Sequence, residues 1–93
     1  LSGKMSVEGT FKNGLPEGPW KYYHTNGFVS GKGHYKTGKR DGVWIFYHKN
    51  GKVEAEGRYK QDEPIGKWYF YDVQGEMKEM RDFDLEAQLF KEE

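Results

Sequence analysis

The 93-residue chain has no cysteine, which excludes disulfide bonds and thiolate metal sites. This absence does not decide between the cytoplasm and the cell envelope, because disulfide-free proteins occur in both. Neither sign of charge predominates, since 15 lysines and arginines balance 15 aspartates and glutamates. The sequence therefore lacks the basic footprint typical of nucleic-acid-binding proteins. It also has no run of about 18 apolar residues, so no membrane-spanning helix is expected.

Glycine and aromatic residues are abundant instead, and they recur every 24 residues. The segments GPWKYYHTNG, GVWIFYHKNG and GKWYFYDVQG begin at Gly18, Gly42 and Gly66. The segments GTFKNG, GHYKTG and GRYKQD begin at Gly9, Gly33 and Gly57. A fixed period of this length is typical of repeat proteins, whose units bury their faces only by stacking on one another. Leucine-rich repeats have a similar period, but the four leucines here fall in no repeat column.

Each unit is expected to form a β-hairpin. The Trp segment predicts one strand, and the segment ending in Tyr-Lys predicts the returning strand. Asn26-Gly27 and Asn50-Gly51 favour type I′ turns between them, because both residue types tolerate a positive φ. Loops at residues 37–41 and 61–65 would join successive hairpins. The predicted fold class is all-β, an elongated antiparallel array of about three and a half units that ends in a short helix.

We expect a single repeat domain over residues 1–93. Its parts are listed in chain order: a partial repeat at 3–14, repeats at 18–38, 42–62 and 66–83, and a capping helix at 85–93. Asp84 is the predicted N-cap of that helix, which should dock on the last hairpin and cover its edge. The first segment matches only the second half of a repeat, so something upstream is expected to have been removed. An uncovered edge at residues 3–11 favours edge-to-edge homodimerisation.

The Trp strand should be apolar on both faces. Trp44 and Phe46 point one way, and Val43, Ile45 and Tyr47 point the other. One set of rings is expected to lie on glycines of the neighbouring strand, such as Gly33 and Gly57, where a missing side chain leaves room. The other set would close a second layer or form an aromatic groove.

The motif G-x-W-x-[YF]-Y-x-x-[NQ]-G followed by G-x-[YF]-K resembles the bacterial variant of the MORN repeat over residues 3–83. The resemblance implies an elongated single-layer hairpin array that binds or scaffolds without catalysis. Proteins of this variant are often labelled YwqK-like antitoxins, which implies a protein partner, and many are exported or lipid-anchored. Asp62 and Arg81 depart from the pattern, because each stands where the repeat has glycine.

A second resemblance is to cell-wall-binding repeats that hold choline or glucan between aromatic rings. It gives Trp20, Trp44 and Trp68 two alternative roles, as a stacking ladder for a saccharide or as the core. The 24-residue period favours the MORN variant, since the wall-binding repeats are shorter. Lipid association is a third alternative, but the neutral charge and the lack of a basic amphipathic helix disfavour it.

The sequence thus predicts a non-catalytic module that binds a protein across its sheet. The candidate contact residues are Tyr23, Tyr47 and Tyr71 with Phe46 and Phe70, and the three tryptophans are further candidates. His24 and His48 share a column with Asp72, but equivalent positions in stacked hairpins lie too far apart to hold one ion, so no metal is expected. No cofactor and no catalytic residue is predicted, because no nucleophile-base pair or phosphate loop is present.

Overall fold

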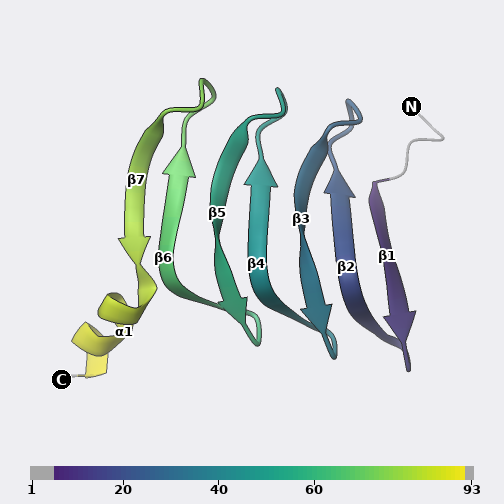
Figure 1. Cartoon of the computed structure of the whole chain (residues 1–93), viewed down its shortest axis with the longest axis horizontal. Coiled ribbons are helices and arrows are strands. Elements are labelled where there is room, and N and C mark those ends of the chain that lie inside the picture. The colour runs from purple at the N-terminus through teal and green to yellow at the C-terminus, as the bar shows by residue number, and fades with distance from the viewer. Residues whose placement is uncertain (1–5, 92–93) are drawn as a thin grey trace.

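The computed structural model describes residues 6–91 as one antiparallel sheet followed by one helix. The elements are β1 (Val7–Lys12), β2 (Leu15–Tyr23), β3 (Val29–Lys36), β4 (Lys39–Tyr47), β5 (Val53–Lys60), β6 (Glu63–Tyr71), β7 (Met77–Asp82) and α1 (Phe83–Lys91). Every strand pairs with its neighbours along the chain, as Figure 1 shows. The molecule measures 50 × 40 × 16 Å, so it is a single layer. The predicted fold class is therefore confirmed. Residues 3–5 of the expected partial repeat and residues 92–93 of the expected helix lie outside the described residues.

The aromatic ladder on one face of the sheet takes the place of a core. Trp20, Trp44 and Trp68 are only 8, 1 and 4% exposed. Each lies flat on a glycine of the strand before it, namely Gly9, Gly33 and Gly57. The strand pairing shifts by two residues at each of these glycines, which marks a β-bulge. The prediction that rings lie on the glycine column is correct, and each ring lies on the preceding strand.

Polar and edge-to-face contacts hold each indole in place. The three indole N–H groups donate to the carbonyl oxygens of Thr10, His34 and Arg58 at 3.0–3.1 Å. The rings of Tyr35 and Tyr59 each stand edge-on between two tryptophans, with centroids 5.0–6.2 Å apart. We call this side of the sheet the ladder face. Edge-to-face packing and indole hydrogen bonds together allow a single layer to exclude water from its tryptophans.

The turns differ from the prediction. Positive φ at two consecutive residues, the mark of a type I′ turn, occurs at Asn13-Gly14, Thr37-Gly38 and Gln61-Asp62. In the turns at the other end of the sheet, only the glycine has positive φ. The type I′ turns predicted at Asn26-Gly27 and Asn50-Gly51 are therefore wrong, although both hairpins form.

The two asparagines act between hairpins instead. The Asn26 side chain accepts the amide of Phe28 at 3.0 Å and donates to the carbonyl of Lys49, in the next unit, at 2.9 Å. Asn50 repeats this arrangement with Lys52 and Val73. The hairpin tips are thus joined along the sheet by side-chain hydrogen bonds.

The helix begins two residues earlier than expected. Asp82 is its N-cap, since the carboxylate accepts the amide of Leu85 at 3.0 Å. The predicted N-cap, Asp84, accepts the amide of Gly66 at 3.0 Å instead and ties α1 to β6. Phe83, the first helical residue, packs edge-on against Trp68, with centroids 6.2 Å apart. The first residue of the helix therefore completes the aromatic packing around the last tryptophan of the ladder.

The helix covers the edge of the sheet only in part. Figure 1 places α1 at one end of β7, next to β6. Met77 and Met80 on β7 are 59 and 46% exposed. All six residues of β1, at the opposite edge, are exposed as well. The expectation that the helix covers the edge holds only at one end of β7, and edge-to-edge dimerisation through β1 stays a prediction.

Candidate functional site

The sheet presents a second face, which carries Tyr23, Tyr47 and Tyr71 and which we call the tyrosine face. Phe46 and Phe70 lie on the ladder face, where both stack beside Trp68 with centroids 6.4 Å away. Adjacent residues of a strand point to opposite faces, so a partner on one face cannot contact both groups. The structure therefore splits the five predicted contact residues into two sets.

The tryptophans are not available as a stacking platform. A saccharide or choline ligand needs exposed ring faces, whereas these rings are at most 8% exposed and lie on glycine backbone. Of the two roles left open by the sequence, the structure supports the core.

Two of the three tyrosines are hydrogen-bonded to an acid of the preceding strand. The hydroxyl of Tyr23 donates to the carboxylate of Glu8 at 2.7 Å, and that of Tyr71 donates to the carboxylate of Glu56 at 2.6 Å. These bonds raise the pKa of both phenols above the ordinary value, and the nearby negative charge adds to the effect. Both tyrosines therefore act as neutral donors, each with its acceptor supplied within the sheet.

The middle tyrosine breaks this rule. The position 15 residues before Tyr47 is Lys32, where the other two units have glutamate. The Lys32 ammonium lies 5.9 Å from the centroid of the Tyr47 ring, and no acid accepts the Tyr47 hydroxyl in the described structure. Lys32 also lies directly opposite Lys21 on β2. Like charges in directly opposed positions destabilise a sheet, and the acid Glu8 opposite Lys21 on β1 can offset this repulsion only at Lys21, since Lys32 faces Ile45 on β4.

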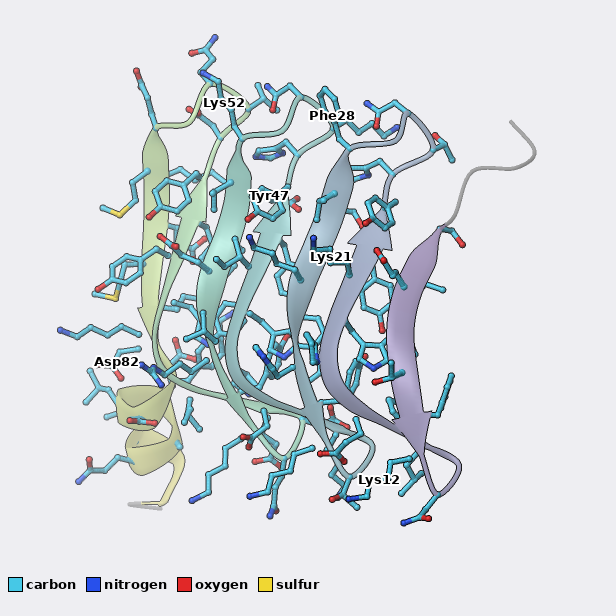
Figure 2. The ribbon with its side chains drawn as sticks, turned by 45° about the vertical axis from the view of Figure 1, so that its right-hand side comes forward. Lys12, Lys21, Phe28, Tyr47, Lys52 and Asp82 are labelled. Carbon is cyan, nitrogen blue, oxygen red and sulfur yellow. The ribbon has the colours of Figure 1, made fainter. Side chains whose placement is uncertain are left out.

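Two shallow hollows adjoin these lysines. One, of about 340 Å³, is lined by Lys21 and Lys32 together with Pro19, His34, Val43 and Ile45, among others. The other, of about 570 Å³, is lined by Lys21, Lys32, Tyr47, Phe28 and Lys52, with residues of two hairpin tips. Figure 2 shows Lys21 and Tyr47 on the strands, with Phe28 and Lys52 at the hairpin tips beyond them. Because both hollows share Lys21 and Lys32, they form one continuous surface on the tyrosine face.

The sequence reasoning missed Lys21 and Lys32. The signal was present in the repeat columns, since position 32 holds lysine between Glu8 and Glu56. What the columns do not show is that residues 21 and 32 lie opposite each other, because that depends on the register of β2 and β3.

The ladder face has its own hollow, of about 310 Å³, next to Tyr22, Tyr35, Arg40 and Phe46. The hydroxyls of Tyr22 and Tyr35 hydrogen bond to each other at 2.6 Å, and their rings pack on tryptophans. Burial and this hydrogen bond raise the pKa of Tyr35 well above its ordinary value. The two hydroxyls are thus hydrogen-bonded to each other, and neither is left without a partner for a ligand to bind.

The histidine column joins neighbouring units. Nε2 of His24 lies 2.8 Å from the carbonyl oxygen of Tyr47, and Nε2 of His48 lies 2.9 Å from that of Tyr71. A carbonyl oxygen only accepts, so both Nε2 atoms carry a proton and donate. Asp72, the third member of the column, accepts the amides of Gln74 and Glu76 in its own turn. Over residues 6–91, no three histidine, aspartate or glutamate side chains gather as a metal site would require.

The described helix is too short and too polar to cross a membrane. Comparison with curated proteins gave no match, and neither did comparison with solved structures. Comparison with protein families matched two stretches of the chain, residues 16–37 and 40–61, to the MORN repeat variant. The two stretches correspond to the hairpins β2–β3 and β4–β5. MORN repeats are repeat modules of a generally binding or scaffold type and are not an enzyme family, and this chain carries two stretches that match their variant form.

Proposed function

We propose that this chain is a non-catalytic module that binds a protein partner across its tyrosine face. The observation that carries the proposal is a difference between the two faces. On the ladder face, the same residue type recurs from unit to unit, as in the glycine and tryptophan columns. On the tyrosine face, the repeated tyrosine column is flanked by equivalent positions that differ between units, such as Lys21, Ile45 and Tyr69.

This difference has a physical reason. A ring that lies on a glycine needs the same two residues in every unit, because any larger side chain would displace the ring. A surface that recognises one particular partner needs no such regularity. The residues that vary between units are therefore the ones free to serve recognition.

The chemistry of the tyrosine face fits a protein better than a saccharide. Tyrosine is enriched at protein interfaces, where its ring packs and its hydroxyl hydrogen bonds. Tyr23, Tyr47 and Tyr71 are half-buried, and Val43 and Phe28 beside them are 47 and 50% exposed. An antitoxin-like role in a bacterium, as the family resemblance implies, would be one form of this function, with a toxin as the partner.

The proposal is tested by affinity capture from the source cells with the wild-type chain, Tyr47→Ala and Tyr22→Ala as baits. Tyr22 is the matched control, since it is a half-buried tyrosine near the end of a Trp strand but lies on the ladder face. Thermal unfolding must first show that all three baits are folded at the capture temperature. One protein that is retained by the wild type and Tyr22→Ala and lost with Tyr47→Ala supports the proposal. A protein lost only with Tyr22→Ala would move the interface to the ladder face, and wall polysaccharide alone would favour the saccharide alternative.

A further inference from the structure

We propose that the surface around Lys21, Lys32 and Tyr47 binds an acidic, partly apolar segment of the partner protein, with a carboxylate held between the two lysines. This inference rests on the proposed function and gives the chemistry of its central contact. We call the surface the lysine site; it comprises Lys21, Lys32, Tyr47, Phe28 and Lys52.

The first argument is charge that the sheet leaves without an ion pair. Lys21 and Lys32 are directly opposed, and the described side chains, those of residues 6–89, form only two ion pairs, Arg40 with Asp62 and Arg81 with Glu86. Glu8 lies opposite Lys21 on the other side and offsets part of its charge, although the two form no ion pair, whereas the other neighbour of Lys32 is the uncharged Ile45. A bound carboxylate would relieve the repulsion between the two ammonium groups.

The second argument is that no acid lines the site. Neither of the two hollows that share Lys21 and Lys32 has an aspartate or glutamate among its lining residues, although the chain has 15 acids. Lys52, at the rim, donates to the carbonyl oxygen of Gln74 at 3.2 Å, a neutral acceptor that leaves its charge in place. Three cations therefore surround one hollow without a counter-charge in its walls.

The third argument concerns Tyr47. In the neighbouring units, the equivalent hydroxyl donates to a glutamate. At Tyr47 the corresponding glutamate is replaced by Lys32. The Tyr47 hydroxyl can therefore donate its hydrogen bond to an acceptor on a bound partner. A carboxylate that bound here would take the place that Glu8 and Glu56 fill in the other units.

The apolar walls decide which anion fits. Phe28, Val43 and Ile45 line the same continuous surface, and a free phosphate would use none of them. The hollows contain no arginine, whose forked guanidinium is the usual partner of phosphate groups. An extended peptide in which acidic and apolar side chains alternate matches both the cations and the apolar walls.

The test uses a short fluorescein-labelled peptide in which glutamate alternates with leucine and tyrosine, and a second peptide with glutamine in place of glutamate. Fluorescence anisotropy should show that the wild-type chain prefers the glutamate peptide and that added salt weakens binding. Lys21→Gln with Lys32→Gln should weaken binding about tenfold, the expected loss for a charge-assisted contact. The matched control is Lys36→Gln with Lys60→Gln, which removes the same amount of charge at the last residues of β3 and β5, away from the lysine site. This control should leave binding unchanged.

A second variant, Lys32→Glu, restores the glutamate that the other two units have at this position. It should give the Tyr47 hydroxyl an acceptor and remove the opposed lysine pair, so the variant should melt at or above the wild-type temperature while it loses the glutamate peptide. Retained peptide binding in Lys32→Glu would overturn the inference. So would equal binding of the two peptides, equal loss in the Lys36/Lys60 control, or displacement of the peptide by millimolar inorganic phosphate. If the peptide result is negative but cellular capture still depends on Tyr47, the lysine site is refuted and the proposed function stands.

Discussion

Substitution of Gly57 by alanine tests the packing on which the whole sheet depends. Gly57 does not have a positive φ, so alanine would not strain the backbone there. A Cβ atom built on Gly57 would lie 2.5 Å from Cγ of Trp68 and closer still to two other ring atoms. Real Cβ atoms do not approach carbon this closely, so the indole has to move. Trp68 is only 4% exposed, and its indole N–H donates to the carbonyl of Arg58. Moving the ring would therefore expose it to water and break this hydrogen bond.

The expected cost is about 3 kcal/mol, the upper end of the range for overpacking and the lower end of that for losing a buried aromatic. In a domain of this size each kcal/mol lowers the melting temperature by about 4 to 8 °C, so Gly57→Ala should melt about 12 to 24 °C below the wild type. Lys60→Ala, on the same strand but exposed, should change stability by less than about 0.5 kcal/mol.

Thermal unfolding followed by circular dichroism measures the difference, and a double-mutant cycle isolates its cause. In a Trp68→Leu background, the alanine at position 57 should cost less than about 1 kcal/mol, because the ring that it displaces is absent. If Gly57→Ala and Lys60→Ala melted within about 2 °C of each other, the ring-on-glycine account of the fold would be wrong.

Three further predictions concern contacts at the ends of the sheet. Asn50→Asp keeps the acceptor for the Lys52 amide but loses the donor to the carbonyl of Val73, so urea unfolding should show a loss of about 1 kcal/mol, whereas a role in turn conformation alone would make it nearly neutral. In a double-mutant cycle, Arg40→Pro and Asp62→Gly should be non-additive, because the Asp62 carboxylate accepts both the amide and Nε of Arg40; additive values would show that the contact contributes nothing. The same bonds, chiefly the one from the Arg40 amide, hold the pKa of the Asp62 carboxyl below its ordinary value. The stability that they contribute is therefore complete above the ordinary pKa and is lost as the pH falls through the lowered pKa of the folded state. The advantage of the wild type over Asp62→Asn should therefore shrink in acid, and a difference that stays constant with pH would contradict this cause.

The ladder could be predicted from the sequence because its determinants are local and repeated. Glycine and tryptophan columns at one spacing require a ring and a gap in neighbouring strands, and period-two alternation puts them on one face. The direction of the contact, onto the preceding strand, follows from the bulge at each glycine. A bulge depends on how two strands pair, which no spacing within one strand reveals.

The turns could not be predicted for a similar reason. Asn-Gly is a local signal for a type I′ turn, and the chain does form such turns at Asn13-Gly14. At Asn26 and Asn50, however, the side-chain amides donate to carbonyls 23 residues away, in the next hairpin. This non-local contact, together with the bond to the backbone two residues on, holds the asparagine outside the left-handed region.

Departures from the repeat separate structure from function. Arg81 replaces a glycine, but no tryptophan strand follows β7, so its side chain is free to pair with Glu86 and to lie 4.6 Å from the centroid of the Phe83 ring. Asp62 also replaces a glycine, and its carboxylate binds Arg40, which stands where the other units have proline. Contacts within the chain thus explain both of these departures. Lys32 is different, because it takes away the acceptor of Tyr47 and sets a second cation opposite Lys21. At this exposed position the repeat gives up a hydrogen bond and gains a repulsion, and the acidic partner segment that we propose would supply the missing acid.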